Sequence, residues 1–276
     1  MIKQGPEHTS RVAGTSPPVL VLSVCWRTGS TLLQRLLCDA GILVWGESGG
    51  ALDGLEDAFE RYRQMTGPGG TRFRHGFGGN GTQQYERFAS DPRSGAHHWI
   101  ACMNPPPPTI EDAFRNLFLK LYAHPAHALG FGRWGIKEVQ VGADAARWMQ
   151  TLFPGSQVVV LARHPYDVLL SIKRRNWMDR RETRFPLLHY ARHWARMARS
   201  LRTVPDAVLV RYEDLVGRPE TCERLAERLQ APVRFELIET SRADWRAERN
   251  ASLTRAERLA IRALTREAAS DWGYRL

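Results

Sequence analysis

The residues with the clearest chemical potential follow an apolar run near the start of the chain. Trp26-Arg27-Thr28-Gly29-Ser30-Thr31 lies between the apolar segment Val19–Cys25 and an apolar helical pattern. A turn between a strand and a helix presents backbone N–H groups, hydroxyl groups and the positive end of a helix dipole to one point. Arg27 adds a guanidinium group, which suits phosphate and sulfate oxygens. The segment therefore predicts an anion-binding site.

This turn differs from the loop that binds ATP or GTP, which reads G-x-x-x-x-G-K-[ST]. Ser30 stands at the position of the lysine, and Val24 stands at the position of the first glycine. Arg27 supplies positive charge from the other side of the turn. These differences favour a related anionic donor over a nucleoside triphosphate. A small-molecule kinase with an aberrant loop stays open as an alternative.

A second anion-binding pattern follows the apolar segment Gln157–Ala162. Arg163 comes at the end of that segment, and Ser171 follows eight residues later, which is about two helical turns. Pro165 and Asp167 suit the first turn of a helix. Arg163 and Ser171 can therefore reach a second anionic group near the same sheet edge.

Together the two patterns resemble the sulfotransferases that use 3′-phosphoadenosine 5′-phosphosulfate. Trp26–Thr31 is similar to their 5′-phosphosulfate loop, especially in the W-R-[TS]-G-[ST] form of carbohydrate sulfotransferases. Arg163…Ser171 is similar to their 3′-phosphate site, R-x-P-x-D-x-x-x-S. Arg211-Tyr212-Glu213-Asp214-Leu215 resembles a late segment of the family, and Asp271-Trp272-Gly273-Tyr274 resembles its usual end. Residues 50–130 and 177–205 match no segment of the family that we can name.

The resemblance implies a donor-binding role for each matching position. The residues implied for the 5′-phosphosulfate, which would act largely through backbone N–H groups, are Arg27, Thr28, Gly29, Ser30, Thr31 and Leu32. Arg163 and Ser171 would hold the 3′-phosphate. The glycine-rich adenine loop of the cytosolic branch is not visible, so Arg242 and Trp245 are the candidates for adenine contacts. A solvated turn is the alternative for these two residues.

Transfer to a hydroxyl group needs a base that takes the proton. The resemblance implies this role for Glu47, with a solvated loop carboxylate as the alternative. His75, His97 and His98 are rival bases, because histidine titrates near neutrality.

Lys137 resembles a lysine that faces the transferred sulfate in the family. With Arg27 it would stabilise the charge that develops during transfer. The alternative for Lys137 is a salt bridge with Glu138 or another neighbour. A sulfuryl group carries less charge than a phosphoryl group, so we expect no metal ion.

Apolar runs alternate with amphipathic stretches, which predicts an α/β fold with a parallel sheet covered on both faces. The expected strands are Val19–Cys25, Trp134–Val139, Gln157–Ala162 and Ala207–Arg211. The expected helices are Thr31–Ala40, Gly142–Phe153, Tyr166–Asn176, Leu187–Thr203, Arg218–Leu229 and Thr254–Ala269. We therefore predict a three-layer α/β/α architecture that resembles P-loop NTPases.

The organisation along the chain predicts a disordered leader over residues 1–17 and a single domain over residues 18–276. Residues 50–130 interrupt the pattern and are interpreted as an acceptor-binding insertion or lid. This region includes Gly67–Gly81, which is rich in glycine, and Pro105–Pro108, which predicts a stiff polyproline segment. Low-complexity disorder is the alternative for Gly67–Gly81.

Composition limits the remaining classes. Hydrophobic residues make up 43% and charged residues 25% of the chain, as in soluble globular proteins. No run of about eighteen apolar residues suggests a membrane span, and the four scattered cysteines are typical of a reducing cytoplasm. The formal charge of +10 comes mostly from arginine, which suggests either GC-rich bacterial coding or a polyanionic ligand.

These considerations predict a cytoplasmic, bacterial enzyme that acts on a carbohydrate, lipid or natural product. No motif supports nucleic-acid binding. A non-enzymatic polyanion-binding protein stays open as a second alternative. The sequence does not predict the oligomeric state.

Overall fold

The computed structural model describes residues 16–66, 79–175, 186–238 and 251–276. Within these residues five parallel strands form one sheet in the order β2-β3-β1-β4-β5. The strands are β1 (Val19–Ser23), β2 (Ile42–Trp45), β3 (Arg133–Glu138), β4 (Gln157–Ala162) and β5 (Val208–Arg211). Four of them were predicted within two residues at each end. β2 was not predicted, because its four residues are too few to show a period.

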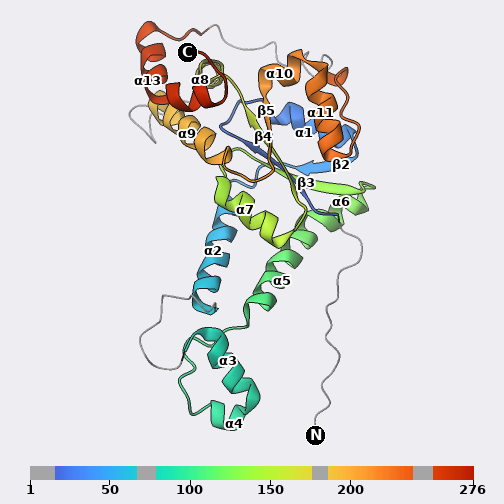
Figure 1. Cartoon of the computed structure of the whole chain (residues 1–276), viewed down its shortest axis with the longest axis vertical. Helices are drawn as coiled ribbons and strands as arrows, with labels where there is room; N and C mark the ends of the chain where they lie inside the picture. Colours follow the sequence, from blue (N-terminus) through green and yellow to red (C-terminus); the bar gives the residue numbers. More distant parts are fainter. Residues whose placement is uncertain (1–15, 67–78, 176–185, 239–250) are drawn as a thin grey trace.

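Helices cover both faces of this sheet (Figure 1). On one face lie α1 (Ser30–Asp39), α10 (Tyr212–Gly217) and α11 (Pro219–Leu229). On the other lie α7 (Ala143–Leu152), α8 (Pro165–Arg174), α9 (Pro186–Leu201) and α13 (Arg255–Asp271). The predicted three-layer α/β/α architecture is confirmed.

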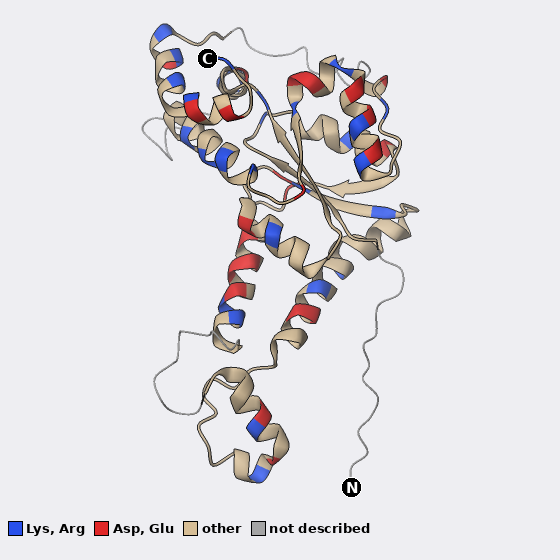
Figure 2. Ribbon diagram, in the orientation of Figure 1, with Lys and Arg blue, Asp and Glu red and all other residues tan. Residues whose placement is uncertain are grey.

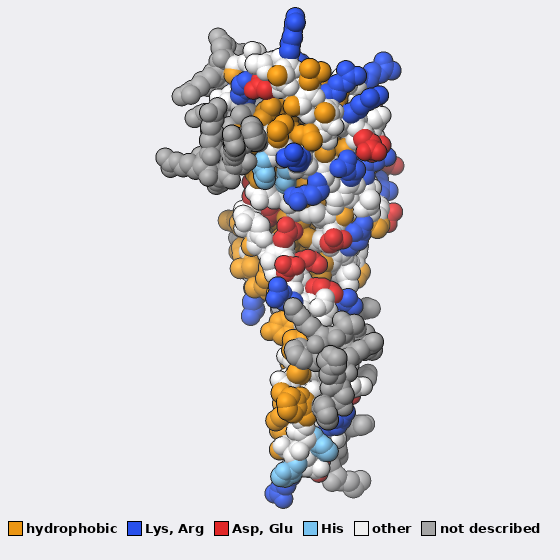
Figure 3. Space-filling model, turned by 90° about the vertical axis from the view of Figure 1, so that its left-hand side faces the viewer, with side chains coloured by type: hydrophobic (Ala, Val, Ile, Leu, Met, Phe, Trp, Pro, Cys, Tyr) orange, Lys and Arg blue, Asp and Glu red, His pale blue; other side chains and the backbone are white. Residues whose placement is uncertain are grey.

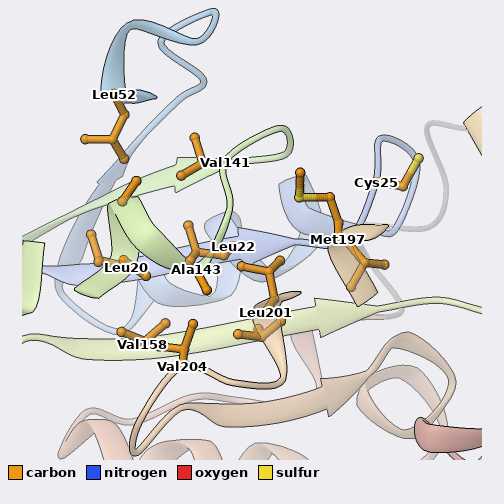
Figure 4. Close-up of a cluster of buried hydrophobic side chains, with 14 of the residues drawn as sticks. Leu20, Leu22, Cys25, Leu52, Val141, Ala143, Val158, Met197, Leu201 and Val204 are labelled. Carbon is orange, nitrogen blue, oxygen red and sulfur yellow. The ribbon is translucent and has the colours of Figure 1, made fainter. Parts of the chain in front are cut away.

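Two hydrophobic cores lie on opposite faces of the sheet. Leu20 and Leu22 of β1 point into one core, where they lie near Leu201, the last residue of α9, and Val204 just after it (Figure 4). Val21, between them, belongs to the other core. Successive strand residues point to opposite faces, so a strand with a core on each face must be apolar throughout.

Residues 51–128 form an arm that extends away from the sheet (Figure 1). Its helices are α2 (Ala51–Thr66), α3 (Gly81–Ser90), α4 (Pro92–Gly95), α5 (Pro107–Phe118), the π-helix η1 (Leu119–Ala123) and α6 (His124–Ala128). α2 and α5 run between the sheet and the small α3–α4 unit at the far end. The expected insertion therefore consists largely of helices.

The proline run of the arm differs from the prediction. Pro106 is extended, with φ −64° and ψ 155°, but Pro107 is already the first residue of α5. In the first turn of a helix the backbone N–H groups have no intrahelical partner, so proline loses nothing by lacking one. Its fixed φ also suits a helix start. A polyproline conformation throughout Pro105–Pro108 is therefore wrong.

The predicted leader is described only at Ser16 and Pro17. The carbonyl oxygen of Ser16 accepts a hydrogen bond from Nε1 of Trp134 at 3.2 Å, and its Oγ donates to the carbonyl oxygen of Gly132 at 3.3 Å. Across the four described ranges, no helix has the length and apolar character needed to span a membrane.

The central strand pairing tolerates no side chain at Gly135 of β3. A Cβ atom added there would lie 2.3 Å from the carbonyl oxygen of Val19 in β1. We expect Gly135→Ala to lower the free energy of unfolding by about 2 kcal/mol, a cost typical of overpacked cores. The clash of the added methyl group with Val19 can be removed only if the paired strands move apart. Urea denaturation measures this change. Gly132→Ala, where the added Cβ meets no atom within 4 Å, is the control, and equal loss in both variants would contradict the explanation.

Candidate functional site

The loop after β1 has the backbone shape that an anion-binding turn requires. Arg27 and Gly29 both have positive φ values, 64° and 93°. Thr28 is buried, and its Oγ1 donates to the carbonyl oxygen of Cys25 at 3.1 Å, which closes the turn. Gly29 is the N-cap of α1, and no side chain in the described residues caps this helix. No side-chain cap therefore occupies the first N–H groups of α1, which can serve an anion, although that of Leu32 donates to the carbonyl oxygen of Gly29 at 3.0 Å.

Tyr212, at the start of α10, explains why residue 29 must be glycine. A Cβ atom added to Gly29 would lie 2.3 Å from Cδ2 of the Tyr212 ring. The same ring lies beneath Arg163, whose guanidinium carbon is 4.5 Å from the ring centroid. Tyr212 thus contacts both predicted anion-binding segments. The sequence analysis noted its segment but assigned this tyrosine no role.

The two predicted halves of the donor site are joined by direct hydrogen bonds. Nη1 of Arg163 donates to the backbone carbonyl oxygen of Arg27 at 3.2 Å. Nε of Arg27 donates to Oγ of Ser171, on α8, at 3.0 Å. Arg27, assigned to the 5′-phosphosulfate, therefore contacts a residue assigned to the 3′-phosphate. The buried Nε of Arg163 has no hydrogen-bond partner among the described residues.

The remaining loop residues differ in exposure. Ser30 is buried, Leu32 is half-buried and Thr31 is exposed at the start of α1. Arg242 and Trp245, the adenine candidates, lie outside the described residues, as does His75.

Glu47 and Lys137 form an ion pair at the same sheet edge. Nζ of Lys137 lies 2.5 Å from Oε1 of Glu47, and the Lys137 side chain is 5% exposed while that of Glu47 is 39% exposed. Glu47 follows β2, and Lys137 lies near the end of the adjacent strand β3. The alternative stated for Lys137 was a salt bridge with Glu138 or another neighbour. Adjacent strand residues point to opposite faces, so Lys137 pairs with Glu47 instead.

Glu138 holds the loop that carries Glu47. Its Oε1 accepts hydrogen bonds from the backbone N–H of Ser48, at 2.8 Å, and from Oγ of Ser48. Oγ of Ser48 in turn accepts from the N–H of Leu52 in the first turn of α2, at 3.3 Å. Burial raises the pKa of Glu138, while the two Ser48 hydrogen bonds lower it. A buried carboxylate needs such partners, but the sequence carried no signal that Ser48 supplies them.

Trp26 packs against a buried histidine of α9. The ring centroids of Trp26 and His193 are 4.8 Å apart, and Tyr190 meets the Trp26 ring edge-on at 5.5 Å. His193 is 7% exposed, and its Nε2 has no hydrogen-bond partner among the described residues. His193 was not among the predicted site residues, because it stands in a region without a recognisable motif.

His97 and His98, two of the rival bases, lie in the turn after α4 and are exposed. α4 is at the far end of the arm, well away from the sheet (Figure 1). The structure therefore does not bring them to the loop after β1. Within the described ranges there is no group of three or more His, Cys, Asp or Glu side chains that could hold a metal ion.

Charge is unevenly distributed beside this edge. α2 begins four residues after Glu47 and carries acidic side chains along its length (Figure 2), namely Asp53, Glu56, Asp57 and Glu60. Figure 3 shows acidic side chains gathered below a group of Lys and Arg side chains. Burial raises the pKa values of Asp53 and Glu56, and the negative charge of Asp57 raises both further. The formal charge of +10 is therefore not spread uniformly.

Comparisons with known proteins identify the family and support the fold. A family model described as the sulfotransferase family matches residues 18–235. The sulfotransferase domain from the Synechococcus PCC 7002 olefin synthase is 19% identical, with a TM-score of 0.52 over 100% of both chains. The sulfotransferase domain from the curacin biosynthetic pathway is 19% identical, with a TM-score of 0.53 over 95% of this chain and 100% of that chain. A search of curated proteins found no significant match.

The buried His193 generates a pH prediction. Burial, together with the charges of nearby Arg196 and His189, lowers the pKa of His193 to about 4. An unfolded histidine has a pKa near 6.5. Between these values the unfolded chain binds a proton that the folded protein excludes, so stability falls as the pH falls from 6.5 to 4. We expect this group to account for about 3 kcal/mol of that loss.

Urea denaturation at pH 6.5 and pH 4 measures the effect. The decrease in the free energy of unfolding between the two pH values should be smaller by about 3 kcal/mol in His193→Phe. The phenylalanine ring suits a site beside Trp26 and Tyr190. His97→Gln, at an exposed position, should behave like the unsubstituted protein. The same pH dependence in all three proteins would show that His193 is not responsible.

Proposed function

Because this chain belongs to the sulfotransferase family, we propose that it transfers a sulfuryl group from 3′-phosphoadenosine 5′-phosphosulfate to a hydroxyl acceptor. The acceptor would be a carbohydrate, a lipid or another natural product. The observation that carries the donor assignment is the pair of hydrogen bonds from Arg163 to Arg27 and from Arg27 to Ser171. They join two anion-binding segments in one network, which suits a donor that carries two separate anionic groups.

The geometry supports a division of roles along the sheet edge. The loop N–H groups and Arg27 would hold the 5′-phosphosulfate, while Arg163 and Ser171 would hold the 3′-phosphate. Preorganised donors of this kind stabilise charge without having to reorganise during the reaction. Arginine, lysine and backbone amides then supply the charge stabilisation for the transferred group.

The reaction would be an in-line displacement at sulfur. The acceptor oxygen forms a bond to sulfur as the bond from sulfur to the bridging donor oxygen breaks. Glu47 would take the acceptor proton, and Lys137 would neutralise the charge that develops on the bridging oxygen. Their ion pair supports this assignment, because a base and a cation so close together can act on the same reacting group. The partial exposure of Glu47 leaves it accessible to an acceptor.

A ligand-binding experiment tests the donor assignment. We expect 3′-phosphoadenosine 5′-phosphate to raise the melting temperature, since a ligand at a hundred times its Kd stabilises the folded state by about 2.7 kcal/mol. ATP and duplex DNA at equal concentration should raise it much less. Arg163→Ala should remove the preference, whereas Arg63→Ala on the arm should not. Stronger stabilisation by ATP would favour a kinase, and stronger stabilisation by DNA would favour a polyanion-binding protein.

Glu47→Gln tests the assignment of the base. The amide keeps the shape of the side chain but cannot accept the proton, so turnover should fall about a hundredfold or more. Binding of 3′-phosphoadenosine 5′-phosphate, measured by calorimetry, should be retained. Turnover is measured with the best acceptor from a screen of hydroxylated metabolites.

Glu227→Gln, at an exposed position of α11, is the matched control for Glu47→Gln. It should leave both turnover and donor binding unchanged. If Glu47→Gln also retains full turnover, the base lies elsewhere.

A further inference from the structure

The C-terminal residues return from α13 to the end of β4. Nε1 of Trp272 donates to the carbonyl oxygen of Ala198 in α9 at 3.0 Å, which anchors the tail to the core. Trp272 is 5% exposed and Tyr274 is 8% exposed. Gly273 between them has a φ of 75°, a conformation that favours glycine. The tail is therefore a packed part of the fold at this point.

Glu213 connects this tail to the second anion-binding segment. Its Oε2 accepts a hydrogen bond from the hydroxyl group of Tyr274 at 2.9 Å. Its Oε1 accepts a hydrogen bond from the backbone N–H of His164, also at 2.9 Å. His164 directly follows Arg163. One carboxylate thus ties the C-terminal tyrosine to the backbone beside the arginine that donates to the β1 loop.

The His164 side chain is held by the same tail. Its ring centroid lies 5.3 Å from that of Tyr274, in an edge-on contact. Nδ1 of His164 accepts from the backbone N–H of Tyr166 at 3.3 Å, and Nε2 lies 3.1 Å from the carbonyl oxygen of Arg275. The neutral imidazole with its proton on Nε2 satisfies both contacts. The C-terminal segment therefore holds the side chain of His164 directly, and Glu213 of α10 holds its backbone.

Within the part of the chain that the structure describes, the hydrogen bonds to Glu213 come from these two donors. Arg211 is engaged by Asp214, to which its Nε and Nη2 donate at 2.6 Å and 3.0 Å. Burial and the charge of Glu213 raise the pKa of Tyr274, so its hydroxyl group stays protonated and donates. A hydrogen bond to a charged acceptor is stronger than one between neutral groups.

From these contacts we infer that Tyr274, acting through Glu213, is a positioning residue for Arg163 and so sets the affinity of the site for the donor's 3′-phosphate. This inference rests on the proposed function, which assigns Arg163 to that phosphate. It extends the donor site to the end of the chain, to a residue that touches neither the loop after β1 nor α8 in the contacts described above.

The test compares two ligands that differ only in the 3′-phosphate. Calorimetry measures the Kd of 3′-phosphoadenosine 5′-phosphate and of adenosine 5′-phosphate. Tyr274→Phe removes one hydroxyl group and keeps the ring against His164. We expect the Kd of the bisphosphate to rise about fivefold, a fraction of what loss of a direct charged hydrogen bond would cost. The Kd of the monophosphate should stay within about twofold of its original value.

A double-mutant cycle separates positioning from general destabilisation. In an Arg163→Ala background, Tyr274→Phe should cause no further loss of bisphosphate affinity. Tyr62→Phe, which removes a hydroxyl group on the exposed side of α2, is the matched control and should alter neither Kd. The melting temperature without ligand confirms that each variant is folded.

Two results would overturn the inference. One is an unchanged bisphosphate Kd in Tyr274→Phe, and the other is an equal rise for both ligands, which would indicate a purely structural role. Failure of the proposed function gives a different result, because the unsubstituted protein would then bind the two ligands equally. That result would overturn the inference as well as the proposed function, before any variant is measured.

Discussion

The parallel pairing of β1 with β3 and β4 is the constraint on which the rest of this site depends. The carboxyl ends of neighbouring parallel strands lie at the same edge of the sheet. The loop after β1, Lys137 on β3 and Arg163 after β4 therefore meet there, although Arg27 and Arg163 are 136 positions apart in the chain. The close approach of Gly135 to Val19 belongs to the same pairing. A fold that changed this strand order would separate the two anion-binding segments.

Three charged groups at this edge have partners that give the site its shape. Lys137 is paired with Glu47, Glu138 accepts from Ser48, and Glu213 accepts from His164 and Tyr274. An unpaired buried charge would cost several kcal/mol. Satisfying each charge therefore fixes a loop: the segment after β2, the segment after β4 and the C-terminal tail. The contacts that pair these charged groups are therefore also the contacts that hold the site in its shape before a ligand binds.

The arm marks the limit of reasoning from the sequence. Residues 50–130 were expected as an insertion, but neither α2 nor α5 was anticipated. The glycine-rich and proline-rich segments dominated the interpretation there. Proline predicted an extended segment, yet Pro107 begins a helix because its missing N–H group does no harm in the first turn. His97 and His98 were candidate bases by chemistry alone, and only the length of the arm separates them from the sheet edge.

The sequence by itself determined the features that depend on neighbouring residues. The turn at Gly29, the helix start at Pro165 and the alternation of strands with helices all follow from local spacing and conformational preference. Only the tertiary structure decided which charges pair. Lys137 stands beside Glu138 in the chain, but the two side chains leave opposite faces of β3, so Lys137 meets Glu47 of the adjacent segment instead. The same holds for Arg27 with Ser171 and for Glu213 with Tyr274, because strand order and register, rather than proximity in sequence, bring these partners together.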